Sequence, residues 1–238
     1  MMVKIYFITF GGGDINYLEA VSRICEQSKQ LNVFDKIIGY TPIYLINDKE
    51  FWKLHGDFIK NNKRGFGYWL WKPYLIIKTL ELLDDEDILV YLDCGCEIDI
   101  RNKNQILELF KIVKTDKIIG SYVKKSKESA WTKKDLFIAL QTLKSKYIYS
   151  EQRQATGLIL LKCKEVVKLV NQWYKIGSNY HLIDDSSSKE KNFNNFKEHR
   201  HDQSILSLLT KKYNIFSTHS ISPAIYISRN KTGTTKIY

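Results

Sequence analysis

The sequence has no long hydrophobic run, and this absence excludes a membrane-spanning helix. No stretch of about 18 consecutive apolar residues occurs in the 238-residue chain, whereas a helix needs roughly 20 to cross a bilayer. The strand-like segment 3–9 starts so early that it leaves no room for the charged and apolar parts of a signal peptide. We therefore expect a cytoplasmic protein with no transmembrane segment.

Cysteine is scarce and scattered, which argues against a zinc site. The only close pair, Cys94 and Cys96, has one intervening residue, whereas zinc-binding pairs typically have two to four. We interpret the four cysteines as reduced thiols that mostly belong to the core.

Nothing that resembles an interdomain linker occurs before about residue 184. Because 44% of the residues are hydrophobic, the chain can bury a complete core, and we expect one domain over residues 1–238. The polar, low-complexity segment 184–197 predicts a mobile loop that closes over a site, and 219–238 a C-terminal tail.

Strand-like and helix-like segments alternate along the chain. Apolar residues with helical spacing at 74–83 and 102–114 lie between short apolar runs that predict strands at 3–9, 36–39, 88–92, 117–121 and 154–162. This alternation predicts an α/β fold with a mostly parallel central sheet and helices on both faces.

The net charge of +11 favours anionic partners such as nucleotides, phosphorylated carriers, nucleic acid or a membrane surface. No nucleic-acid-binding module is recognisable and the basic residues do not gather on one element, so we expect no nucleic-acid partner. Peripheral contact of the basic surface with a membrane stays open.

The segment Asp87–Glu97 carries the clearest signal of a functional site. Its five apolar residues, Ile88–Leu92, indicate a strand covered on both faces, whose carboxyl end is where open α/β sheets bind ligands. Asp93, Gly95 and Glu97 share one face if the extended conformation continues past this end. Asp93 either caps the next turn or holds a divalent cation against a diphosphate, with Gly95 allowing close approach.

A glycine-rich loop, Phe10–Asp14, follows the first predicted strand. Its spacing matches neither the dinucleotide-binding fingerprint nor a P-loop. The loop is either a loose turn or a place where a nucleotide approaches the backbone. In the second case Thr9, Phe10 and Gly11 are the candidate contacts.

The run Arg64–Pro73 has the most unusual composition, with two glycines, four aromatic residues and two cations. Tyr68 and Trp71 either belong to the core or line a sugar-nucleotide pocket. Arg64 and Lys72 are candidate phosphate ligands, because arginine pairs with phosphate bidentately and lysine supplies a point charge.

Two further segments carry candidate residues. In Glu198–Ser204, His201, Asp202 and Gln203 are capable of proton transfer or of recognising sugar hydroxyls, although Asp202 could instead cap the following helix. Arg229, in the basic C-terminal tail, is a candidate for binding phosphates.

Taken together, the sequence resembles a family of GT-A glycosyltransferases found among capsular-polysaccharide and viral glycan genes. The similar segments are Arg64–Pro73, Tyr91–Cys96, the strand that contains Gly157, and Glu198–Ser204. The resemblance implies a single GT-A domain with a Rossmann-like sheet and a nucleotide-sugar donor. It also implies that Asp202, Gln203 and His201 face the transferred sugar, since the Asp-Gln pair is similar to that of glycogenin-like retaining transferases.

The resemblance further implies a divalent metal, Mn²⁺ or Mg²⁺, held by the central-strand aspartate. Asp93 matches the first position of the family's Asp-x-Asp motif, but Gly95 stands at the third position. Glu97, Asp99 or His219 would then have to complete the metal site. We expect Asp93, Glu97 and His219 as ligands.

The sequence therefore predicts a transferase that moves a sugar from a nucleoside diphosphate to a hydroxyl of a glycan or glycoconjugate in polysaccharide biosynthesis, with help from a metal. The alternative is a catalytically inactive module with the same fold that binds nucleotide sugars or glycans.

Overall fold

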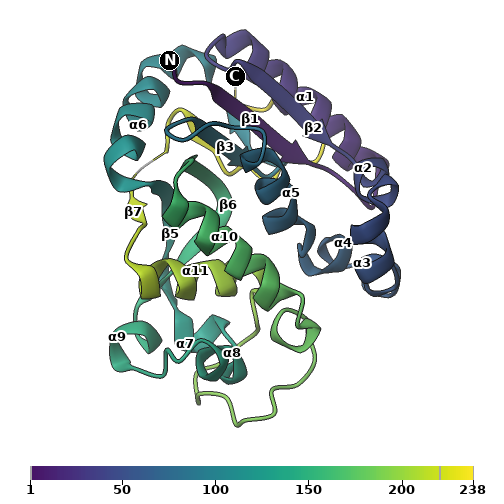
Figure 1. Ribbon diagram of the computed structural model, residues 1–238, viewed down its shortest axis with the longest axis vertical. Coiled ribbons are helices and arrows are strands. Elements are labelled where there is room, and N and C mark those ends of the chain that lie inside the picture. Colours follow the sequence, from purple (N-terminus) through teal and green to yellow (C-terminus); the bar gives the residue numbers. More distant parts are fainter. Residues whose placement is uncertain (1, 220, 238) are drawn as a thin grey trace.

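A six-stranded sheet with the order β2-β1-β3-β6-β5-β7 forms the centre of the molecule (Figure 1). This computed structural model describes residues 2–219 and 221–237. Strand β6 runs antiparallel to β3 and β5, while the β1-β2, β1-β3 and β5-β7 pairs are parallel. The predicted α/β fold with a mostly parallel sheet is confirmed. The strands are β1 (Ile5–Phe10), β2 (Lys36–Tyr40), β3 (Ile88–Leu92), β5 (Ile118–Lys127), β6 (Glu151–Leu161) and β7 (Ser217–Thr218).

Helices cover both faces of this sheet, and β3 contributes to a hydrophobic core on each side. Leu89 and Tyr91 pack in one core with residues of α5 (Trp71–Leu80), α10 (Lys164–Gly177) and α11 (His201–Tyr213). The alternate residues Ile88, Val90 and Leu92 pack in the other core with α1 (Ile15–Leu31) and α6 (Lys103–Asp116). The uninterrupted apolar run of β3 follows from this double burial, which contributes about 1.5–3 kcal/mol per large side chain.

Shorter elements complete the fold. Figure 1 shows α7 (Glu128–Trp131), α8 (Lys134–Ala139) and α9 (Ser145–Ile148) gathered at one end of the sheet, away from α1. No helix in the described ranges is long and apolar enough to cross a membrane. The remaining elements are α2 (Pro42–Asn47), α3 (Lys49–Asn61), α4 (Gly65–Tyr68), the 3₁₀ helices Ile100–Asn102 and Tyr180–Leu182, and a two-stranded sheet of β4 (Glu97–Ile98) and β8 (Ile225–Tyr226).

The element α4 is one turn of left-handed helix. Five consecutive residues, 65–69, have φ values of 58°, 53°, 84°, 53° and 61°. The N–H groups of Tyr68 and Trp69 donate to the carbonyl oxygens four residues earlier. A left-handed residue with a side chain costs about 1–2 kcal/mol, so Gly65 and Gly67 lower the cost of this turn.

Candidate functional site

A cavity of about 750 Å³ opens at the carboxyl ends of the parallel strands β1 and β3. Residues of seven segments line it, namely 10–14 and 17 at and after the end of β1, 63–66, 69, 71 and 72 in and around the left-handed turn, 93–96 after β3, 123 of β5, 154–156 of β6, 198–203 before and within α11, and 227, 229 and 231 of the C-terminal tail. The segments that carry the candidate residues thus meet at one edge of the sheet.

Three charged side chains form the wall of this cavity, and we call Asp93, Lys72 and Asp202 the lysine triad. The Lys72 ammonium lies 2.9 Å from Asp202 Oδ2 and 3.2 Å from Asp93 Oδ1, and it donates to the carbonyl oxygen of Ala155 at 3.2 Å. The side chains of Lys72 and Asp202 are only 3% and 6% exposed, whereas that of Asp93 is 31% exposed. Lys72, predicted to bind phosphate, therefore has two carboxylates as its partners.

Burial sets the protonation chemistry of the lysine triad. It raises the pKa of Asp202 to about 6, although the attraction of Lys72 opposes this rise. Burial also opposes the charge on Lys72, but Asp202 and Asp93 outweigh it and raise the pKa of the ammonium. Near neutral pH Lys72 is therefore an ammonium, and the pKa of Asp202 is close enough to the pH for its carboxyl to exchange a proton.

Asp202 does not occupy the capping position of α11. The N-cap is Arg200, which makes no side-chain cap hydrogen bond, and Asp202 lies in the first helical turn. Here the positive end of the helix dipole favours its charged form. The capping interpretation of Asp202 therefore lacks support, and its carboxylate points to Lys72.

The neighbours of Asp202 are held by the surrounding protein. His201 has a left-handed φ of 50°, packs between the rings of Tyr68 and Trp69, and its Nδ1 lies 2.7 Å from the carbonyl oxygen of Ile183. Burial lowers the pKa of His201, so the ring is neutral at neutral pH. The Gln203 amide donates to Gln152 Oε1 at 2.7 Å.

Aromatic rings form a further part of the cavity wall, near Lys72, whose ammonium lies 6.0 Å from the centroid of the Trp71 ring. Trp71 packs against Phe10 with ring centroids 4.0 Å apart, and its indole N–H donates to the carbonyl oxygen of Gly65. Trp71, Phe10 and Gly11 line the cavity as predicted, whereas Tyr68 and Thr9 are buried and are not among the lining residues.

Arg64 reaches across the cavity mouth to the opposite segment. Its guanidinium lies 3.0 Å from Asp185 Oδ2 and 3.6 Å from Glu198 Oε2, and the Arg64 side chain is 47% exposed. The exposed guanidinium can exchange these carboxylates for an anionic ligand, since surface ion pairs contribute only about 0–1 kcal/mol.

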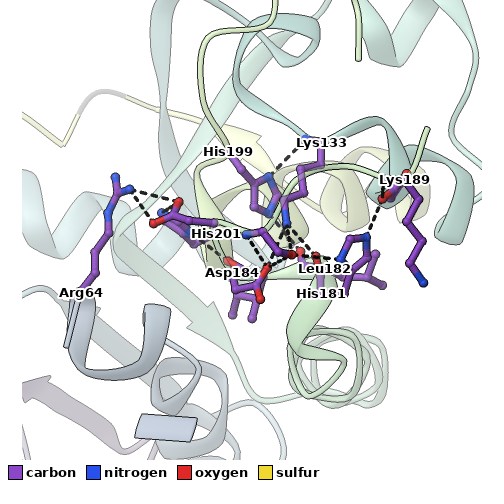
Figure 2. Close-up of polar contacts among 12 residues, drawn as sticks. Arg64, Lys133, His181, Leu182, Asp184, Lys189, His199 and His201 are labelled. Atoms are coloured by element: carbon purple, nitrogen blue, oxygen red, sulfur yellow. Dashed lines mark hydrogen bonds and ion pairs between the residues drawn. The ribbon is translucent and has the colours of Figure 1, made fainter. Parts of the chain in front are cut away.

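The segment that starts at Asp184 is fastened to the body of the protein (Figure 2). Lys133 Nζ donates to the carbonyl oxygen of His181 and contacts Asp184, while His199 Nε2 donates to the carbonyl oxygen of Leu182. Asp135 accepts from the backbone N–H groups of residues 189 and 190. The mobility expected for 184–197 stays a prediction.

The predicted metal ligands do not meet, which corrects the expected metal site. Glu97 is fully buried and its carboxylate accepts hydrogen bonds from Ser228, Asn230 and the backbone of Lys236. Burial by itself raises the pKa of Glu97, but these hydrogen bonds outweigh it and lower the pKa. Glu97 therefore fastens the C-terminal tail.

The other two predicted ligands have partners elsewhere. His219 Nε2 lies 3.1 Å from Asp116, and Asp93 pairs with Lys72. Within residues 2–219 and 221–237, no group of three or more His, Cys, Asp or Glu side chains is placed to hold a metal ion. The donor set therefore does not fit the divalent metal that the family resemblance implies.

The predicted set did not include several of the lining residues, among them Trp69, Gln154 and Lys231. Trp69 lies within the selected aromatic run and Lys231 two residues after Arg229, so composition had marked both segments. Gln154 begins a predicted strand, and nothing local distinguishes it from any other polar strand residue.

No family model and no curated protein matches the sequence. Solved structures that align with it include the apo form of mouse xyloside xylosyltransferase 1, with 10% identity, a TM-score of 0.47 and coverage of 92% of this chain and 86% of that one. A glycosyltransferase involved in glycosylation of the major capsid of PBCV-1 has 10% identity and a TM-score of 0.47, covering 91% and 82%.

The galactosyltransferase LgtC, in complex with donor and acceptor sugar analogs, aligns with 11% identity and a TM-score of 0.43, covering 97% of this chain and 84% of that one. All three proteins are glycosyltransferases. Similarity at this level transfers no substrate, metal or mechanism to this chain.

Proposed function

We propose that this protein is a glycosyltransferase that moves a sugar from a nucleoside diphosphate sugar to a hydroxyl group of a glycan or glycoconjugate. The observation that carries the proposal is the lysine triad at the wall of the 750 Å³ cavity, which aromatic rings and exposed cations also line. Aromatic rings can pack against a sugar and a nucleotide base, and cations can bind a diphosphate. Carboxylates can stabilise a sugar ring that becomes positively charged.

In this reaction the bond between the anomeric carbon and the diphosphate breaks, and its electron pair leaves with the diphosphate. Positive charge then develops on the sugar ring. With Asp202 ionised, the lysine triad has a net charge of one negative unit, because one ammonium faces two carboxylates. This charge is preorganised next to the cavity and would stabilise the developing positive charge.

Asp202 has two roles that agree with its pKa of about 6. It can accept the proton of the acceptor hydroxyl while the new bond to the anomeric carbon forms. Alternatively, it can stabilise the charged ring while the departing phosphate accepts that proton. His201 and Gln203 would orient Asp202 and the sugar, and Arg64 would bind the diphosphate.

The proposal covers residues 1–238 as one domain, with 184–197 closing over the bound sugar. A role in polysaccharide biosynthesis, a cytoplasmic location and peripheral membrane contact are part of the same proposal and rest on the sequence.

The test is a panel of nucleoside diphosphate sugars, screened first by thermal shift and then for turnover. A donor at 100 times its dissociation constant should stabilise the fold by roughly 2.7 kcal/mol, or about 5–10 °C at this chain length. Transfer to a hydroxyl acceptor, or slow donor hydrolysis, is the expected result. Binding without either reaction would indicate the inactive module, and no binding by any donor would refute the proposal.

A further inference from the structure

The C-terminal tail lies directly over the turn that follows β3. The carbonyl oxygen of Gly95 accepts hydrogen bonds from the Asn230 backbone and the Ser228 hydroxyl, both at 2.9 Å. A Cβ atom at position 95 would lie 3.3 Å from the Cα of Arg229 and 3.5 Å from its carbonyl carbon. A side chain at position 95 would therefore be crowded against the backbone of the tail.

Buried hydrogen bonds fix the tail in this place. Arg23 of α1 donates to the carbonyl oxygens of Cys94 and Cys96 in the turn, and of Asn230 and Thr232 in the tail, at 2.7–3.1 Å. The Arg23 side chain thus joins the turn to the tail, and the Glu97 carboxylate adds further hydrogen bonds to the tail. Arg23, Glu97 and Asn230 are each at most 5% exposed, so these bonds are shielded from water.

The fixed tail places two cations at the cavity. Arg229 and Lys231 both line it, and Arg229 has a left-handed φ of 53°. Neither residue forms an ion pair within the described part of the chain, whereas Arg64, Lys72 and Lys133 do. The ammonium of Lys231 lies 5.2 Å from the centroid of the Tyr17 ring, which also lines the cavity. With no carboxylate partner to displace, both cations are placed to bind an anion.

We propose that Arg229 and Lys231 neutralise the diphosphate of the donor in place of a divalent metal ion, so that sugar transfer does not require a metal. This inference rests on the proposed function. Two cationic side chains supply the same two positive charges as Mg²⁺ or Mn²⁺. The carboxylate that would hold a metal, Asp93, is compensated by Lys72, and position 95, packed against the tail, has no carboxylate.

The experiment measures binding of inorganic pyrophosphate, UDP and GDP by isothermal titration calorimetry in excess EDTA. We expect the parent to bind pyrophosphate and one of the nucleotides without metal, and the double variant Arg229→Ala/Lys231→Ala to bind at least about tenfold more weakly. Lys236→Ala is the matched control, since it removes an exposed ammonium from the same tail outside the cavity. It should bind like the parent.

Turnover of the sugar donor distinguishes this inference from the function on which it rests. Turnover that persists in EDTA and falls in the double variant supports the inference. Binding or turnover that appears only after Mn²⁺ or Mg²⁺ is added overturns it but leaves the proposed glycosyltransferase intact. A double variant that binds as tightly as the parent in EDTA also overturns it. No donor turnover with or without metal refutes the proposed function, and the inference with it.

Discussion

The ammonium nitrogen of Lys72 lies 2.9 Å from the carboxylate of Asp202, and both side chains are almost completely buried. Lys72 belongs to α5 and Asp202 to α11, while the third member of the lysine triad, Asp93, follows β3. One cation thus holds together residues from three elements. Removing it would leave Asp202 without the ammonium that opposes the rise of its pKa.

The first prediction concerns the pH dependence of turnover. Because the pKa of Asp202 is about 6 and the ionised form is the reactive one, the rate should rise with pH through an apparent pKa of about 6. It should be about tenfold lower at about pH 5 than at about pH 7. In Lys72→Met the rise of the rate with pH should occur at higher pH, since Lys72 lowers the pKa of Asp202. A profile that is flat between these pH values would contradict a reactive Asp202.

The same pKa gives a stability prediction with a defined sign. The pKa of Asp202 in the folded protein is raised from 3.8 to about 6, so folding favours the protonated carboxyl. Its stabilising contribution is complete below about pH 4 and is lost as the pH rises through about 6. The melting temperature of the parent should therefore fall relative to that of Asp202→Asn over this interval, as measured by parallel thermal scans.

The second prediction is the loss of activity in Asp202→Asn. Asparagine keeps the shape of the side chain but cannot accept a proton, so the rate should fall by on the order of 10² or more. Lys72 retains Asp93 as a partner, so the fold should persist. Asp57→Asn, at a side chain that is 94% exposed, is the matched control and should keep the parental rate. Full activity in Asp202→Asn would leave Gln203 and His201 as the residues to examine.

The third prediction tests the left-handed turn. Gly67 has a φ of 84°, and a Cβ atom there would lie 2.7 Å from Ile59 Cγ1. Gly67→Ala should therefore lose at least about 1–2 kcal/mol, which corresponds to a fall of roughly 3–8 °C in melting temperature.

Gly233→Ala is the control for that measurement. Its new methyl group would meet the nearest atom, Glu19 Cβ, at an ordinary contact distance of 3.4 Å. It should melt close to the parent. Equal melting temperatures for the two variants would mean that residues 65–69 do not need a left-handed turn.

The fourth prediction separates binding from stability at Arg64. Because its ion pairs are exposed, Arg64→Ala should leave the melting temperature nearly unchanged while weakening UDP or GDP binding by about tenfold. Arg64→Lys should be intermediate, since lysine cannot bind a phosphate bidentately. Lys60→Ala removes another exposed cation, which pairs with Asp57 and does not line the cavity, and should not change affinity. Unchanged affinity in Arg64→Ala would assign Arg64 a purely structural role.

Local sequence patterns determined the layered arrangement of sheet and helices and the position of the candidate site. The five apolar residues of β3 required burial on both faces, and this requirement predicted helices on both sides of the sheet and a site at Asp93. The composition of Arg64–Pro73 likewise marked a segment that lines the cavity, because cations next to aromatic rings suit a sugar-nucleotide pocket.

Tertiary structure decided which partners these residues have. Lys72 pairs with Asp202 because α11 packs against β6 and α10 beside α5, and no local pattern specifies contacts between elements so distant in sequence. Glu97 follows Asp93 by only four residues in the sequence. Its carboxylate nevertheless binds the tail, because Arg23 and Asn230 hold the tail over Gly95. The periodicity of apolar residues predicts which side chains are buried. Which charged side chains pair depends on which distant segments pack together, and only the folded structure determines this.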